Sequence, residues 1–215
     1  MVYDDLYKLV FELETNNFAS WNDSYGFYEI ILGNGIVEKH INQDHTRMIF
    51  SDYIKIKNKS QENFNRIVSF GNFTSHNTAK IEAQKYKVDL VTIPVPLSND
   101  SFGTNRCSCG DNEHLTSFEC IFPRTTLFDL DVLVDFGIQE SIVGIGEYLG
   151  LYFSLIDYHI KNNNKPDSDL ICFVVNKFLE FTENFENDCD HDLLKRICVL
   201  LSLKCIIMRH NMNMK

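Results

Sequence analysis

The chain has 215 residues, of which 44% are hydrophobic and 23% charged. This composition is typical of an ordinary globular protein, and the length allows one large core or a core with a smaller attached unit. Because 20 basic residues face 30 acidic ones, the formal net charge is -10, which disfavours a general affinity for nucleic acid or anionic membranes. No apolar run reaches the roughly 18 residues of a membrane-spanning helix, and the acidic amino terminus is unlike a signal peptide. We therefore expect a cytoplasmic protein with no nucleic-acid or membrane partner.

The first 136 residues predict alternating strands and helices. Residues 2–16 have helical apolar spacing, residues 27–32 predict a strand, and Gly33-Asn34-Gly35 predicts a tight turn into a short helix. A further strand is expected within residues 47–56. Residues 67–70 predict a buried strand, followed by a helix capped by Thr74 or Ser75 and by the strand VDLVTIP. Strand, helix and strand in this order form a βαβ unit, so we expect a parallel sheet.

The second part of the chain has a different pattern. A short β segment, TSFECIFP, and an apolar run, LFDLDVLVDF, precede three stretches with helical periodicity, at residues 139–161, 168–184 and 193–210. The sequence thus predicts an α/β protein with a Rossmann-like parallel-sheet domain over residues 1–136. An all-helical domain is expected over residues 137–215.

The seven cysteines are expected to remain thiols. Cys172, Cys198 and Cys205 fall in apolar helical patterns and are predicted to be small core residues. The segment CSCGDNEHLTSFEC contains the residues of a candidate zinc site, namely Cys107, Cys109, His114 and Cys120. Its C-x-C spacing differs from the C-x2-C pairs of zinc ribbons, so we prefer to interpret it as a polar loop before a strand.

The most informative stretch is residues 91–106, VTIPVPLSNDSFGTNR. An apolar β-branched run ends in two prolines, which stop a strand, and a polar loop with Ser98, Asn99 and Asp100 follows at once. In α/β proteins, ligands bind at the carboxyl ends of parallel strands. The pattern therefore predicts a strand that delivers a polar loop to a ligand site.

The motif Ile-Pro-x-x-x-Ser-x-Asp at residues 93–100 resembles the dehydroquinate synthase-like superfamily, which includes glycerol-1-phosphate dehydrogenases, glycerol dehydrogenases and iron-dependent alcohol dehydrogenases. Three further motifs occur in the family's order: a Gly turn with Thr-Ala-Lys at residues 71–80, Asp-Leu-Asp at 129–131 and Gly-x-Gly-Glu at 144–147. The resemblance covers residues 65–209, and residues 28–42 weakly. It implies the same order of an α/β domain and a helical domain, the latter partial relative to the family.

The resemblance also implies site residues. The pyrophosphate loop of an NAD(P) cofactor matches residues 71–80, and the cofactor-binding positions are Gly71, Asn72, Asn77, Thr78, Lys80 and Ser98. Such loops hold phosphates because glycines let backbone amides approach them and the helix amino terminus is partially positive. Asp100 matches an aspartate beside the substrate and nicotinamide, and is the candidate catalytic residue. Glu147 matches the first ligand of zinc or another divalent metal.

The chain departs from the family pattern at several positions. Asn72 and Phe73 stand where the family has glycines, Asn77 stands where it has aspartate, and Val95 and Pro96 stand where it often has threonines. The family's two other metal ligands are histidines, for which this chain offers only His191 and His210. His159 is twelve residues beyond Glu147, about 18 Å along a helix, and cannot share its metal.

Three functions remain open. The first is a metal- and NAD(P)-dependent dehydrogenase of a polyol phosphate, of the glycerol-1-phosphate dehydrogenase type. The second is a catalytically lapsed or partner-dependent homologue that acts as a binding subunit, favoured by Phe73, Val95 and Pro96. The third is a carbocyclic cyclase of the dehydroquinate synthase kind, favoured by glutamate at position 147. A homo-oligomer, or a partner subunit that completes the metal site, is compatible with the first two.

Overall fold

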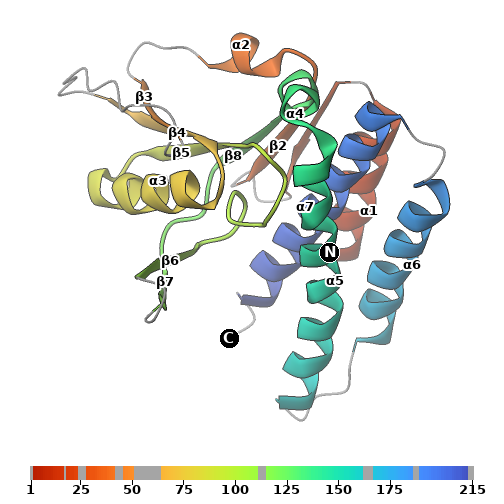
Figure 1. The fold of residues 1–215 in the computed structure, drawn as a ribbon. Helices are drawn as coiled ribbons and strands as arrows, with labels where there is room; N and C mark the ends of the chain where they lie inside the picture. Colours follow the sequence, from red (N-terminus) through yellow and green to blue (C-terminus); the bar gives the residue numbers. More distant parts are fainter. Residues whose placement is uncertain are drawn as a thin grey trace.

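A parallel sheet with a helical layer beside it forms the framework of the molecule (Figure 1). The computed structural model describes residues 2–16, 18–23, 28–41, 46–50, 64–110, 115–161, 167–185 and 189–212. The strands are β1 (Ala19–Asn22), β2 (Glu29–Gly33), β3 (Thr46–Phe50), β4 (Arg66–Gly71), β5 (Asp89–Pro94), β6 (Arg106–Gly110), β7 (Leu115–Glu119) and β8 (Thr125–Asp129). The helices are α1 (Val2–Thr15), α2 (Ile36–His40), α3 (Phe73–Tyr86), α4 (Leu130–Phe136), α5 (Ile138–Lys161), α6 (Ser168–Asn184) and α7 (Asp190–Met212).

The main sheet has six described strands in the order β1-β2-β8-β5-β4-β3. Strands β2, β8, β5, β4 and β3 run parallel, and β1 lies antiparallel to β2 at one edge. The unit β4–α3–β5 is the βαβ unit expected from the sequence, with Gly71 paired to Pro94 where both strands end. The prediction of an α/β fold with a parallel sheet and a helical carboxyl-terminal part is therefore confirmed.

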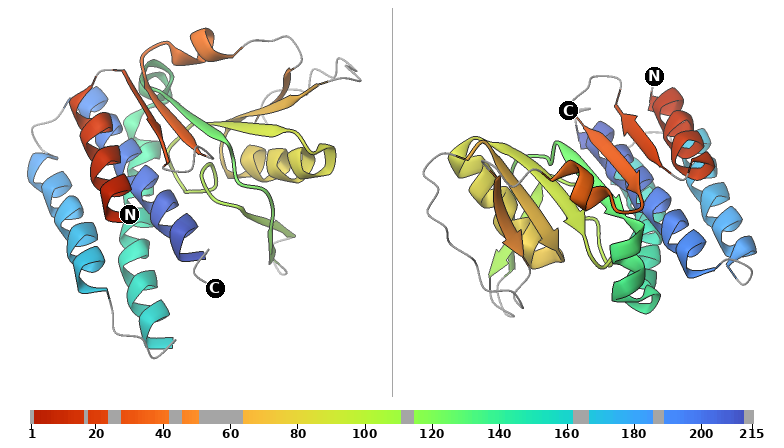
Figure 2. Two further views of the ribbon diagram at one scale, coloured as in Figure 1. Left: turned by 180° about the vertical axis from the view of Figure 1, so that it is seen from behind. Right: turned by 90° about the horizontal axis from the view of Figure 1, so that it is seen from above.

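The helices cover the sheet unequally. Helix α3 contacts β3, β4 and β5, and also β6, which forms a two-stranded hairpin with β7. Helix α7 contacts α1, α4, α5 and α6, so that the first helix of the chain packs within the helical layer. Figure 2 shows this layer from behind and from above, beside the sheet. No described helix is long and apolar enough to cross a membrane.

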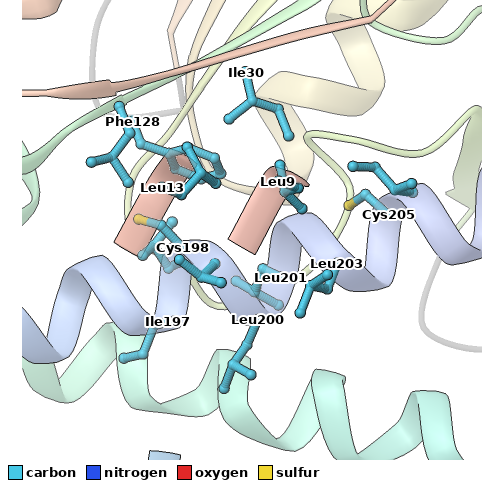
Figure 3. Packing of buried hydrophobic residues seen from close by; sticks show 14 of the residues in the cluster. Leu9, Leu13, Ile30, Phe128, Ile197, Cys198, Leu200, Leu201, Leu203 and Cys205 are labelled. Atoms are coloured by element: carbon cyan, nitrogen blue, oxygen red, sulfur yellow. The ribbon is translucent and has the colours of Figure 1, made fainter. Parts of the chain in front are cut away.

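One hydrophobic core joins the sheet to the helical layer (Figure 3). Leu9 of α1, Ile30 of β2, Phe128 of β8 and Leu201 of α7 are all fully buried in it. Burial of a side chain of this size contributes about 1.5–3 kcal/mol, before the entropy of ordering the chain is subtracted. The core contains residues from both sides of position 136, and it fixes α7 relative to the strand ends.

Three local predictions, of the cap of α3 and of the positions of Cys107 and Cys172, are wrong. Helix α3 is capped by Asn72, whose side chain accepts from Thr74 N at 3.1 Å, because Ser75 instead donates to the Asn72 carbonyl at 2.8 Å. Cys107 lies on β6 instead of in a loop, and its buried side chain contacts the Asn77 carbonyl of α3. Cys172 is exposed because the neighbouring positions of α6 face the core, whereas Cys198 and Cys205 are buried as expected. The six described cysteines are free thiols.

Candidate functional site

The loop that leaves β5 is held between the end of β4 and α5. Val95 N donates to the Gly71 carbonyl at 2.9 Å, and Leu97 N donates to Ser141 Oγ at 3.3 Å. Both donors belong to buried residues, so these bonds satisfy backbone groups that could not reach water. The loop is therefore fixed by its own backbone, and it presents Ser98, Asn99 and Asp100 at the carboxyl end of the parallel sheet.

The first glycine of the Gly-x-Gly-Glu motif lets α5 approach this loop. A Cβ atom at Gly144 would lie 2.0 Å from the Leu97 carbonyl oxygen and 3.0 Å from Leu201 Cδ1. No real Cβ contact is that short, so only glycine allows the two backbones to pack at this distance. A Cβ atom at Gly146 would have no neighbouring atom within 4 Å. Close packing therefore explains the first glycine and not the second.

Asp100 and Glu147 converge on one lysine. Lys204 Nζ, on α7, lies 3.0 Å from Asp100 Oδ2 and 2.5 Å from Glu147 Oε2. The lysine side chain is 8% exposed, against 22% for Asp100 and 40% for Glu147. Burial alone would lower the pKa of Lys204, but the charges of Asp100 and Glu147 and the hydrogen bonds to them outweigh it and raise that pKa above its ordinary value. We call Asp100, Glu147 and Lys204 the ion triad.

No motif in the sequence singles out Lys204. The signal was a lysine inside the apolar stretch of residues 197–207, of which every member is buried. A charged residue at such a place is almost always paired. Its spacing offered no way to identify the partners, because Asp100 and Glu147 come from two distant segments and only the folded chain brings them together.

The amino-terminal turn of α3 follows directly from β4. Gly71 has φ 128°, a value that favours glycine, and Asn72, Phe73 and Thr74 are all exposed after it. Phe73 is 41% exposed at the first helical position. The turn thus presents the positive end of a helix beside the loop of Asp100, and such an end attracts anionic groups.

The other positions that were predicted to bind the cofactor have contacts within the protein. Asn77 Nδ2 donates to the Ser108 carbonyl at 3.2 Å, and Lys80 Nζ donates to the Arg106 carbonyl at 2.9 Å. Burial lowers the pKa of Lys80. Thr78 Oγ1 donates to the Thr74 carbonyl, and Ser98 Oγ accepts from the Asn99 side chain. In this structure Asn77 and Lys80 hold the hairpin of β6 and β7 on α3, which places them on the covered side of the helix.

A divalent metal does not fit the described residues around Glu147. The Lys204 ammonium occupies the space between the two carboxylates. Among the residues that the structure describes, no three His, Cys, Asp or Glu side chains are grouped to hold a metal ion. His191 contacts Asn34 Oδ1 at 3.2 Å and lies thirteen residues before Lys204 on α7, about 20 Å along the helix. His210 is half-buried in the last turn of α7.

The candidate zinc segment, residues 107–120, falls partly outside the described structure. The side chains of Cys109 and His114 are not among the described ones, and neither is that of His159, which the sequence excludes as a partner of Glu147. Two other cysteines of this segment are described. Cys107 Sγ lies 3.7 Å from the Asn77 carbonyl oxygen, and Cys120 is half-buried after β7. The zinc hypothesis for this segment therefore stays a prediction.

Comparison with known proteins gives a limited match in sequence. No protein-family model matches the chain. Over 96 residues, 45% of this chain, it is 22% identical to a glycerol-1-phosphate dehydrogenase (NAD(P)+) from Methanosarcina barkeri, and the match spans 27% of that protein.

The match in structure is broader. A probable glycerol dehydrogenase from Sinorhizobium meliloti shares 13% identity with a TM-score of 0.51, over 66% of this chain and 43% of its own. An iron-containing alcohol dehydrogenase from Thermotoga maritima shares 14% identity with a TM-score of 0.51, and the match covers 68% of this chain and 46% of that protein. Glycerol dehydrogenase from Schizosaccharomyces pombe shares 14% identity with a TM-score of 0.52, and the match covers 66% of this chain and 40% of that protein. The chain thus spans less than half of the length of these proteins, and it has the fold of the iron-containing alcohol and glycerol dehydrogenases, as the resemblance to their superfamily predicts.

Proposed function

We propose that the chain acts as an oxidoreductase that transfers hydride between a nicotinamide dinucleotide and a small polyol phosphate. One observation carries the proposal. Asp100 and Glu147, which two separate motifs single out, meet at the carboxyl end of β5 beside the first turn of α3. Parallel α/β sheets bind their ligands at this edge. The sequence match to a glycerol-1-phosphate dehydrogenase supports the choice of substrate class.

The described residues have distinct places in this proposal. The Gly71 turn and the first turn of α3 would hold the pyrophosphate through backbone N–H groups. Asp100, one-fifth exposed, would accept a hydrogen bond from the substrate hydroxyl and so orient the carbon that loses hydride. The dinucleotide supplies the hydride acceptor when bound. Asp100 can do this because its backbone is fixed and one of its oxygens is held by Lys204.

A fluorescence titration with NADH and NADPH tests the proposal. We expect saturable binding near micromolar concentration. Asn72→Asp keeps a good helix cap but adds a negative charge at the phosphate site, so it should weaken binding about tenfold. Asn72→Ser keeps the cap without the charge and should bind as the unmodified chain does. Absence of binding at millimolar dinucleotide would contradict the proposal, and a screen of polyol phosphates follows only if binding is seen.

A non-catalytic homologue that serves as a binding or partner subunit is the second candidate. The exposed Phe73 ring at the start of α3 favours it, because close approach of a phosphate to the backbone is easier without a side chain. The lysine between the two carboxylates favours it too. This candidate predicts dinucleotide or polyol-phosphate binding with no change in NADH absorbance across the substrate screen. Turnover of any polyol phosphate would exclude it.

A further inference from the structure

The ion triad resembles a cation-binding site in which the cation is a lysine side chain of the protein itself. Two carboxylates from different elements, the β5 exit loop and α5, point at one nitrogen, at 3.0 and 2.5 Å. Two carboxylates this close repel each other unless a positive charge lies between them. The Lys204 ammonium has three donors and gives one to each carboxylate, so that one cation contacts both.

Lys204 cannot easily leave this position. Its neighbours Leu203 and Cys205 are at most 1% exposed, and Cys205 Sγ lies 3.8 Å from the Asp100 carbonyl. A Cβ atom at Gly103 would lie 2.4 Å from Cys205 Sγ, which shows how closely the loop packs on α7 at this residue. Withdrawing the ammonium would leave two partly buried carboxylates close together without a counter-charge, which is unfavourable.

A divalent ion and the ammonium compete for the same space. A metal would need oxygen distances of about 2.0–2.2 Å, which would place it where Lys204 Nζ lies. A third protein ligand is missing among the described side chains. The ammonium supplies one positive charge against two negative ones, so the triad keeps a net negative charge. A second cation could bind between the two carboxylates only by displacing the lysine.

We propose that Lys204 is the resident cation of this site and replaces the divalent metal, so that the protein binds no metal at Glu147. Removing the lysine side chain would open a two-carboxylate site for a hard cation such as Mn²⁺. The inference goes beyond the proposed function, and its test uses neither dinucleotide nor substrate, so the two can fail separately.

Metal analysis and thermal unfolding test this proposal. The purified chain is exposed to excess Zn²⁺ or Mn²⁺, dialysed, and assayed for bound metal, and its melting temperature is measured with each ion and with chelator. We expect no stoichiometric metal and no metal-dependent rise in the melting temperature. Lys195→Ala, a lysine variant on the same helix outside the ion triad, should behave identically. Lys204→Ala should melt lower in chelator and recover part of the loss with Mn²⁺.

Two results would overturn the proposal. The first is one equivalent of zinc bound by the unmodified chain, together with its loss in Glu147→Gln. The second is a folded Lys204→Ala chain that does not respond to either ion, because something other than the lysine would then exclude the metal. If Lys204→Ala does not fold, the metal content of the unmodified chain and of Glu147→Gln still decides the question.

Discussion

His76 is a buried histidine next to the candidate dinucleotide turn. It is 1% exposed, and its Nδ1 lies 2.8 Å from Ser69 Oγ. Burial, with a smaller contribution from the nearby Lys80 charge, lowers the pKa of His76 to about 3. The folded chain therefore keeps this imidazole neutral at pH values where the unfolded chain protonates it.

The stability of the protein should consequently fall in mild acid. Between the ordinary pKa of 6.5 and about 3, each unit of decreasing pH should remove up to about 1.4 kcal/mol from the free energy of unfolding, because only the unfolded chain gains the proton. Urea unfolding across this range would show a flatter slope for His76→Gln. The exposed His40 provides the control, and His40→Gln should keep the original slope. Equal slopes for the unmodified chain and His76→Gln would show that folding does not lower the pKa of His76.

Two glycines that lie two residues apart on α5, Gly144 and Gly146, give a matched test at the scale of the element. Gly144→Ala forces a Cβ atom against the Leu97 carbonyl, and such overpacking costs about 1–3 kcal/mol. Gly146→Ala meets no atom within 4 Å and should stabilise the helix by up to about 1 kcal/mol. Chemical denaturation of the two variants checks both signs. A neutral Gly144→Ala would mean that α5 does not pack directly on the β5 exit loop.

Helix α3 shows why pattern alone did not settle the site. Its position, between a buried strand that ends in glycine and the next strand, is evident from the sequence, and the βαβ unit follows from it. The sequence does not show which face of the helix is buried, because Asn77 and Lys80 are polar yet lie on the covered side. There, carbonyl groups of β6 accept their hydrogen bonds. A polar residue that binds a backbone carbonyl and one that binds a cofactor look alike in sequence.

At the scale of the whole molecule, the sequence predicted the parallel sheet and the helical carboxyl-terminal part because period and length separate strands from long helices. It did not predict that α1 would pack against α7, since contacts between the ends of a chain leave no local pattern. For the same reason the sequence did not predict the contact between Lys204 and Asp100. Motifs singled out Asp100 and Glu147 as candidate site residues, and only the fold showed the lysine between them.

The ion triad also connects the β5 exit loop to the helical layer, and a double-mutant cycle measures this connection most directly. Asp100→Asn, Lys204→Met and the double variant are compared with the unmodified chain by urea unfolding. We predict a coupling free energy of about 1 kcal/mol or more, since the two charges are largely buried and in contact. The remote Lys177→Met should be additive with Asp100→Asn. Additivity of Asp100→Asn and Lys204→Met within about 0.3 kcal/mol would contradict the account, because the lysine would then not be the cation that holds this site together.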